Sequence, residues 1–196
     1  MSADHTIALL LDIEHDDWIA GLAPKQADSL ITQAIRAALE TLKTAGELPQ
    51  SLAGRAVEVS AVLTDNDQVQ ALNRDYRGKD KPTNILSFPQ FDADETHAGL
   101  PDDAAILLGD LVLAFETVAS EAKARDIPIW QHVTHLVIHG LLHLVGFDHV
   151  DDNSAVAMEQ LEVQAMASID LDNPYHFDME QDPTTVIGQD NPATAR

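Results

Sequence analysis

The stretch HGLLHLVGFDH, residues 139–149, contains three histidines and one glycine at the spacing of a metal-binding helix. His139 and His143 stand four residues apart, so on a helix their rings lie on one face and can reach the same ion. Gly146 can adopt the left-handed conformation that ends a helix and turns the chain back. That reversal would bring His149 round as a third ligand, so the stretch predicts a metal site at the end of a helix.

A similar spacing occurs in zinc proteases, in which a glutamate directly after the first histidine acts as the general base. In this sequence that position is Gly140. Imidazole ligands without thiolates suit zinc, although nickel, copper and iron also use them. Three protein ligands leave a position open for water, as in catalytic sites, whereas a closed structural site needs a fourth ligand that the motif does not supply. We therefore predict a zincin-like helix and one zinc ion per chain.

Other polar residues near the motif allow more than one interpretation. His135 lies one turn before His139 and could compete as a ligand, but the chain reversal favours His149. We therefore expect His135 to be packed or to support a ligand, and we expect His132 on the surface. Asp148 could accept a hydrogen bond from a ligand histidine, or it could simply belong to an acidic run.

Length and composition restrict the class of protein. The chain has 196 residues, enough for one domain with a core but few for two. It has no cysteine, which excludes disulfide-linked partners and thiolate zinc sites and fits a reducing cytosol. The longest apolar run near the start, residues 7–11, is too short for a signal peptide or a membrane span. We expect a cytoplasmic protein without a membrane partner.

The charge is strongly negative but unevenly distributed. The formal net charge is −22, from 33 acidic and 11 basic side chains, which taken alone argues against binding to nucleic acid. Binding depends on local patches, however. Four of the eleven basic residues fall within residues 73–84, namely Arg74, Arg77, Lys79 and Lys81. This cluster is either a solvated turn or a site for phosphate groups.

Hydrophobic periodicity predicts a single α+β domain in which a small mixed β-sheet packs with helices. Strands are expected at residues 6–13, 55–64, 83–89 and 106–116. Helices are expected at residues 25–45, from Thr64 to about Tyr76, at 117–125, from Pro128 through the histidine motif, and at 153–169. The domain is expected to span residues 1–172, and the acidic, proline-containing tail at 173–196 is expected to be partly disordered.

Three sequence blocks, in this order, resemble the YbeY family of bacterial rRNA-maturation endoribonucleases. The blocks are LNRDYRGKDKPTNILSFP at 72–89, LLGDLVL at 107–113 and HGLLHLVGFDH at 139–149. Gly140 after the first histidine is the family's own pattern, so the resemblance implies a nuclease rather than a protease that has lost its base. It also implies that His139, His143 and His149 bind zinc and that Arg77 is the important active-site arginine.

The resemblance implies a zinc-dependent endoribonuclease that cleaves single-stranded RNA, matures the 3′ end of 16S rRNA and acts in ribosome quality control. Its partners would be rRNA and the ribosome or ribosome-assembly proteins. In such an enzyme the planar guanidinium of Arg77 would bind two phosphate oxygens. Arg74, Lys79 and Lys81 would contact the neighbouring phosphates.

Other functions stay open at this point. A metallopeptidase or another metal-dependent hydrolase would use the histidines without needing the basic block. A non-enzymatic ribosome-assembly factor would use zinc only to stabilise its fold. Arg77 could then form no more than a structural ion pair with Asp75 or Asp80. The histidine motif itself supplies no evident general base.

Overall fold

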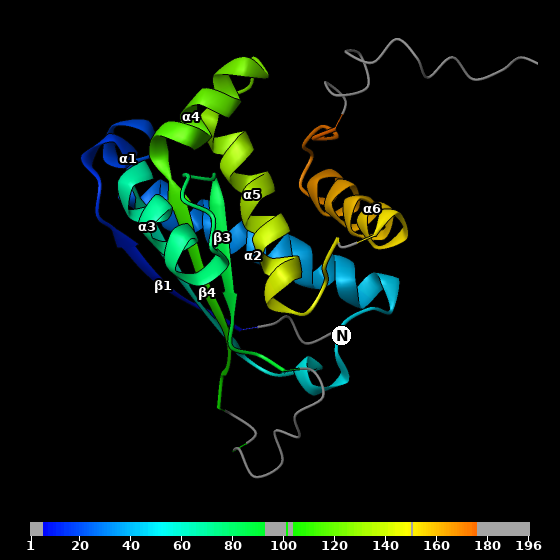
Figure 1. Cartoon of the computed structure of the whole chain (residues 1–196). Coiled ribbons are helices and arrows are strands. Elements are labelled where there is room, and N and C mark those ends of the chain that lie inside the picture. The colour runs from blue at the N-terminus through cyan, green and yellow to red at the C-terminus, as the bar shows by residue number, and fades with distance from the viewer. Residues whose placement is uncertain (1–5, 93–100, 102–103, 150, 176–196) are drawn as a thin grey trace, which may run out of the picture.

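A computed structural model describes residues 6–92, 101, 104–149 and 151–175 of the chain. It confirms one α+β domain with a four-stranded mixed sheet (Figure 1). The strands are β1 (Ile7–Ile13), β2 (Val57–Thr64), β3 (Ile85–Pro89) and β4 (Ile106–Ala114). The helices are α1 (Asp16–Gly21), α2 (Pro24–Ala45), α3 (Asn66–Arg77), α4 (Phe115–Ala124), α5 (Ile129–Leu144) and α6 (Asp152–Ser168), with a short 3₁₀ helix at Gln50–Leu52.

The sheet has the strand order β1-β2-β4-β3. β1, β2 and β4 are parallel, whereas β3 runs antiparallel to β4 at one edge. Alternation along β2 separates the two faces, because Val59 and Ala61 belong to the main core while Val62 packs with α3. α2 and α5 cover the main-core face and α3 lies on the other (Figure 1).

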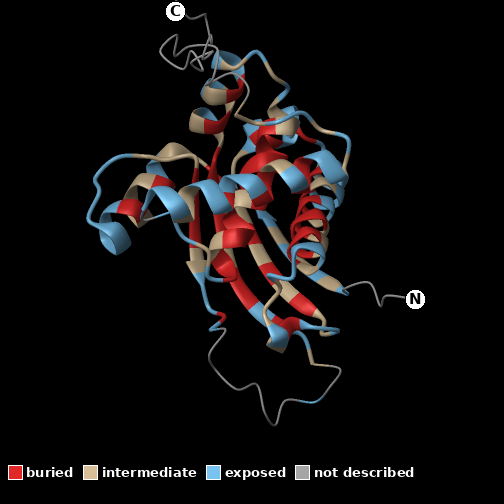
Figure 2. Cartoon of the chain, turned by 90° about the vertical axis from the view of Figure 1, so that its right-hand side faces the viewer, coloured by how far each residue is buried: buried red, intermediate tan, exposed pale blue. Residues whose placement is uncertain are grey.

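Burial follows the same layers. Figure 2 shows buried residues concentrated along the strands and on the helix surfaces that flank them. The main core contains the fully buried side chains Ile31, Leu39, Leu63, Leu111 and Ile138. No helix among the described residues is both long enough and apolar enough to cross a membrane.

The predicted elements are found with small differences at their ends. α1 was not predicted because its six residues are too few for a periodic pattern, yet its Trp18 is fully buried and donates to the carbonyl of Thr64 at 2.8 Å. α3 begins at Asn66 rather than at Thr64, and the carboxylate of Asp65 caps it by accepting from the backbone N–H of Gln68. β4 ends at Ala114, two residues earlier than predicted. Most of the predicted tail, from residue 176, lies outside the described residues.

Candidate metal centre

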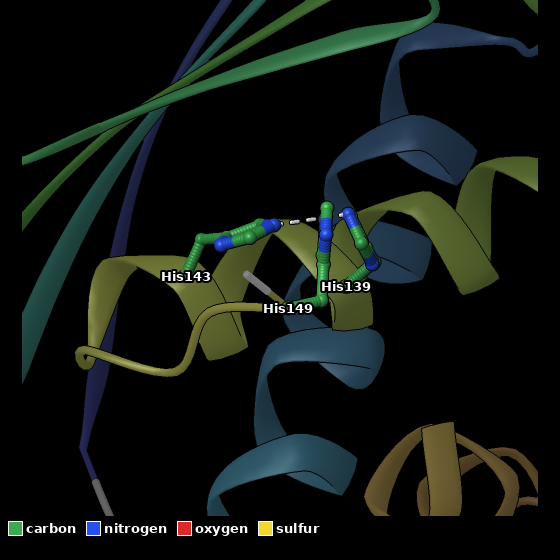
Figure 3. Close-up of side chains that lie close together, drawn as sticks. All are labelled: His139, His143 and His149. Atoms are coloured by element: carbon green, nitrogen blue, oxygen red, sulfur yellow. Dashed lines mark hydrogen bonds between the residues drawn. The ribbon is translucent and has the colours of Figure 1, made fainter. Parts of the chain in front are cut away.

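The three histidines of the motif converge where α5 ends (Figure 3). His139 and His143 lie in the last turns of α5. Gly146, with φ of +99°, turns the chain back after the helix and brings His149 against the other two rings. One ligand atom from each histidine lies within 4.8 Å of those from the other two. The predicted reversal at the glycine therefore brings together three imidazoles that could bind one metal ion.

Hydrogen bonds determine which ring nitrogens remain free. The carbonyl oxygen of Phe147 lies 2.9 Å from His143 Nδ1, and a carboxylate oxygen of Glu162 lies 2.9 Å from His139 Nδ1. Both oxygens are acceptors, so in neutral rings each Nδ1 carries the proton and each Nε2 keeps a lone pair. The two Nε2 atoms face each other at 3.1 Å. Two facing lone pairs repel unless a cation lies beside them, so this donor set fits a divalent ion.

The protonation of His143 suits the same role. Burial, assisted by positive charge on His139, lowers the pKa of His143 to about 4. The Phe147 carbonyl acts in the opposite direction but is outweighed. At neutral pH the ring is therefore uncharged, which is the form that binds a metal.

A buried glutamate of α6 forms hydrogen bonds with two histidines of α5. Glu162 is 1% exposed, and its Oε1 accepts the hydrogen bond from His139. Its Oε2 accepts from His135 Nε2 at 2.6 Å and from the Tyr175 hydroxyl at 2.5 Å. Burial acts to raise the pKa of Glu162, but the hydrogen bonds and charges of the two histidines lower it to about 2. The group is a carboxylate at neutral pH and holds the ring of His139 in one orientation.

Sequence reasoning missed Glu162, although the sequence contains a signal for it. The buried face of α6 comprises Met158, Leu161, Glu162, Ala165 and Met166. This is the spacing of an apolar helical stripe with one acid inside it. A carboxylate is rarely buried without a partner, so its place in the stripe points to a buried donor on a neighbouring element.

The structure agrees with the prediction for His135 but not with the prediction for His132. His135 is 7% exposed and its Nε2 is bonded to Glu162, so it supports a ligand as expected. The prediction that His132 lies on the surface is wrong, because it is 2% exposed and its Nε2 lies 2.7 Å from Glu121. The reason is that α5 is enclosed on almost every side, with all residues from 132 to 138 buried. Asp148 accepts from the backbone N–H of His149 and not from its ring.

Gly140 occupies the position of the glutamate in zinc proteases and faces the sheet. A Cβ at this position would lie 2.7 Å from Leu111 Cδ2, 2.9 Å from Ile85 Cδ1 and 3.1 Å from Ser87 Oγ. The glycine thus allows α5 to approach β3 and β4 closely. A glutamate side chain would have no room at this position, which explains its absence in terms of packing.

Arg77 is the last residue of α3 and borders the same cavity as two of the histidines. This cavity has a volume of about 480 Å³. It is lined by Arg77, Ser87, Pro89, His143, Gly146, Phe147, Asp148 and His149. The Arg77 Nη2 atom donates to the carbonyl of Ser87 at 3.4 Å, a long contact for a hydrogen bond. The guanidinium has five N–H donors, so it can bind a second acceptor in the cavity.

The alternative role for Arg77 as an ion-pair partner does not match the described residues. Among them, Asp75 pairs instead with Arg74, whose Nε lies 2.9 Å from the carboxylate. Asp80 accepts from the side-chain amide of Gln70 at 2.9 Å. Neither acid forms a hydrogen bond or ion pair with Arg77 in the part of the chain that is described.

The other three basic residues flank Arg77 in the sequence but do not line the cavity. Gly78, with φ of +67°, ends α3, and Asn73 fixes the following turn by donating to the carbonyl of Lys81 at 2.8 Å. Arg74, Lys79 and Lys81 are all exposed. Their positions allow contact with a ligand that extends beyond the cavity, and Arg74 must then leave or share its partner Asp75.

Comparisons with known proteins identify the family to which the sequence is similar. Residues 12–170 match the family model described as "Endoribonuclease YbeY". A protein of that name from Sphingopyxis alaskensis is 58% identical over 121 residues, which cover 61% of this chain and 71% of the relative. Proteins of the same name from Rhizorhabdus wittichii and Paramagnetospirillum magneticum are 45% identical over 161 residues and 42% identical over 170 residues. These alignments cover 81% and 87% of this chain, and 91% and 96% of the relatives.

Proposed function

This chain belongs to the YbeY family of endoribonucleases, and we propose that it is a zinc-dependent enzyme that cleaves single-stranded RNA. We further propose that its substrate is rRNA, that it matures the 3′ end of 16S rRNA, and that it acts in ribosome quality control. The observation that carries the proposal is the shared cavity, in which the guanidinium of Arg77 borders the same space as His143 and His149. A phosphate group entering that space would meet both.

The histidines, Arg77 and Glu162 would each have a different role in the reaction. His139, His143 and His149 would hold the ion, and Arg77 would be the catalytic arginine. A zinc ion bound by the histidines would act as a Lewis acid toward the negative charge that develops on a phosphodiester during cleavage. Arg77 would bind two phosphate oxygens through its planar fork, an interaction that strengthens as charge accumulates in the transition state. Glu162 keeps His139 in the tautomer with a free Nε2.

Two features favour a nuclease over a metallopeptidase. Gly140 packs against β3 and β4 where the peptidase motif has its general base. Glu162, the buried acid nearest to the histidines, already accepts hydrogen bonds from three side chains and is not free to accept a proton from water. The peptidase hypothesis also gives no role to the arginine in the cavity.

The charge of the chain suggests how RNA would be recruited. A net charge of −22 opposes general binding to RNA, while Arg74, Lys79 and Lys81 offer local contacts for the backbone. We therefore propose that the ribosome or a ribosome-assembly protein in the cytoplasm delivers the rRNA. We also propose a catalytic domain at residues 1–172 and an accessory acidic tail at 173–196. The first residues of that tail contact the domain, because the Tyr175 hydroxyl donates to Glu162.

A substrate panel tests the proposal directly. The full-length protein, either loaded with zinc or stripped with a chelator, is incubated with single-stranded RNA, double-stranded RNA and casein. We expect cleavage of single-stranded RNA alone, lost on chelation and restored by zinc. Hydrolysis of casein would favour the peptidase. Stoichiometric zinc without cleavage of any substrate would favour the non-enzymatic assembly factor.

The zinc content of the protein tests the three proposed metal ligands. Elemental analysis of protein purified without added metal should give about one zinc per chain, as a three-histidine site implies. His139→Ala and His143→Ala should both lose the metal and should lower the free energy of unfolding, because bound metal favours the folded state. Full zinc occupancy in both variants would refute the assignment of the site.

Arg77→Lys tests whether the planar pair of N–H donors is needed in addition to the positive charge. The variant keeps the positive charge but loses the planar pair of donors, so kcat for RNA cleavage should fall strongly while zinc content is unchanged. Arg74→Lys is the matched control, because Arg74 lies outside the cavity lining and would contact phosphate mainly by charge. Equal, small effects of both substitutions would show that Arg77 does not act on the reacting phosphate.

A further inference from the structure

The edge strand β3 separates two cavities that open on opposite faces of the sheet. Ser87 faces α5 and lines the cavity that contains the histidines. Phe88, the next residue, faces α3 and lines a second cavity of about 380 Å³. Figure 1 shows β3 at the edge of the sheet between α3 and α5. A flexible strand of nucleic acid could therefore pass from one cavity to the other around this edge.

The second cavity has an aromatic wall and an apolar floor. Its lining consists of Val62, Leu72, Tyr76, Phe88, Asp110 and Val112. The rings of Tyr76 and Phe88 meet edge to face, with centroids 5.3 Å apart and planes at 72°. Asp110 already accepts from the side chain of Gln90 at 2.8 Å. The lining is thus suited to a flat, largely apolar group that carries a polar edge.

Tyr76 is the most exposed large apolar side chain of the described residues. It is 72% exposed, compared with 57% for Leu10 and 41% for Trp130. Tyr76 directly precedes Arg77, so the aromatic wall of one cavity and the cation of the other are consecutive residues in the last turn of α3. An exposed aromatic ring beside a guanidinium is the combination by which proteins bind the base and the phosphate of one unpaired nucleotide.

From these observations we propose that the cavity lined by Tyr76 and Phe88 binds an unpaired base of the RNA, next to the phosphate held by Arg77. The inference rests on the proposed nuclease function and adds a base-binding subsite to it. Charge supports RNA as the occupant, because Arg74, Lys79 and Lys81 are exposed around the same turn of a chain that is otherwise acidic. The Asp110 carboxylate can accept a hydrogen bond from an exocyclic amino group of the base.

Such a subsite gives a physical reason for acting on single strands. A base can enter the aromatic cavity only if it is free of its pairing partner and can turn away from its neighbours. The bases of a duplex are paired and stacked, so they would not reach Tyr76 while their phosphate contacts Arg77. Selection for single strands would then arise from binding before any bond is cleaved.

Substitution of Tyr76 tests the proposal without threatening the fold, because the ring is mostly exposed. Binding of a fluorescent single-stranded oligoribonucleotide is measured by anisotropy on the chelator-treated protein, so that binding is read independently of cleavage. Tyr76→Ala should weaken binding by roughly 5- to 150-fold, the loss expected for one stacked base. Tyr76→Phe should restore most of the affinity, because it restores the ring. Trp130→Ala, which removes another exposed aromatic side chain outside both cavities, should leave affinity unchanged.

A second set of substrates identifies the stacked base. Oligoribonucleotides that each lack one base near the cleaved bond are compared on the zinc-loaded protein. One such position should raise KM for the wild type but not for Tyr76→Ala, because the base and the ring act together. Failure of the proposed function would appear as no cleavage at all, whereas the anisotropy result would still report on the subsite.

Two outcomes would overturn the subsite. Unchanged RNA affinity in Tyr76→Ala would show that no base stacks on the ring. Full affinity in Tyr76→Leu, which keeps apolar bulk but loses the aromatic face, would show that the cavity is a general apolar surface for another partner, such as a protein.

Discussion

Replacing Glu162 with glutamine should weaken zinc binding, although Glu162 is not itself predicted to touch the ion. The carboxylate is 1% exposed and accepts from His139 at 2.9 Å, His135 at 2.6 Å and Tyr175 at 2.5 Å. Glutamine has one acceptor oxygen, and its NH₂ group would oppose at least one of these three donors. The loss of a hydrogen bond to a charged group is worth about 1.5–3 kcal/mol. The expected decrease in zinc affinity is therefore about 10- to 100-fold.

The assay is competition for zinc between the protein and a chromophoric chelator at neutral pH. Urea unfolding of the metal-free protein is measured in parallel, because the substitution also affects a buried network. Glu159→Gln is the control for nearby charge, since Glu159 is an exposed residue of the same helix, lines a cavity with His139 and His149, and undergoes the same charge change. We expect the control to lower zinc affinity much less than Glu162→Gln does.

Two results would refute this reasoning about Glu162. If Glu162→Gln and the wild type bind zinc within about twofold of each other, orientation of His139 does not depend on the carboxylate. If Glu162→Gln and Glu159→Gln weaken binding equally, the effect is one of general charge. A fall in unfolding free energy with unchanged zinc affinity would make Glu162 a purely structural residue.

Two further predictions concern packing and pH. Gly140→Ala should destabilise the protein by about 1–3 kcal/mol in urea unfolding, because the new methyl would lie within 3 Å of Leu111 and Ile85; unchanged stability would show that α5 can shift away from the sheet. Burial raises the pKa of Glu121, but hydrogen bonds, led by that from His132, lower it below its usual value of 4.5. The Glu121 carboxylate therefore contributes its full stabilisation of the fold above pH 4.5, and this contribution is lost as the pH falls further. Glu121→Gln should flatten the dependence of stability on acidic pH, and an unaltered curve would contradict this.

The parts of the site that the sequence predicts are those determined by local spacing. His139 and His143 share a face because they lie four residues apart, and Gly146 reverses the chain within three more. The helices predicted at residues 25–45 and from Thr64 to about Tyr76 end where expected, because Gly46 and Gly78 follow them and both adopt positive φ. Each of these predictions needs only the geometry of one turn of chain.

The parts that were missed depend on packing between distant segments. Glu162 follows His139 by 23 residues and meets it only because α6 packs against α5. His132 was misplaced because its burial is decided by the neighbours of α5 and not by its own spacing. Arg77 was not missed, but only the family resemblance singled it out, because it borders the histidine cavity through a contact with Ser87 on another element, β3. Periodicity predicts that a helix has a buried face, but it does not identify the side chain that meets that face.

The end of the domain also involves contacts between distant segments. The boundary after residue 172 stays a prediction, and two residues just beyond it contact the domain. The carbonyl of Pro174 accepts from Arg125 at 3.3 Å, and the hydroxyl of Tyr175 donates to Glu162. Residues 176–196 contain four acids and one base, so they contribute −3 to the net charge of −22. Most of the negative charge therefore belongs to the part before them.

A chain that ends at Tyr175 separates the support of the metal site from the electrostatics of the tail. It should keep the zinc affinity of the full-length protein, because the hydroxyl bonded to Glu162 is retained. Its affinity for RNA should rise only slightly, since little of the repulsive charge has been removed. Tyr175→Phe in this shorter chain should lower zinc affinity, but by less than Glu162→Gln, because one of three donors is lost instead of the shared acceptor. Zinc loss in the unsubstituted shorter chain would show that residues after Tyr175 support the site, and unchanged affinity in Tyr175→Phe would show that its hydroxyl does not.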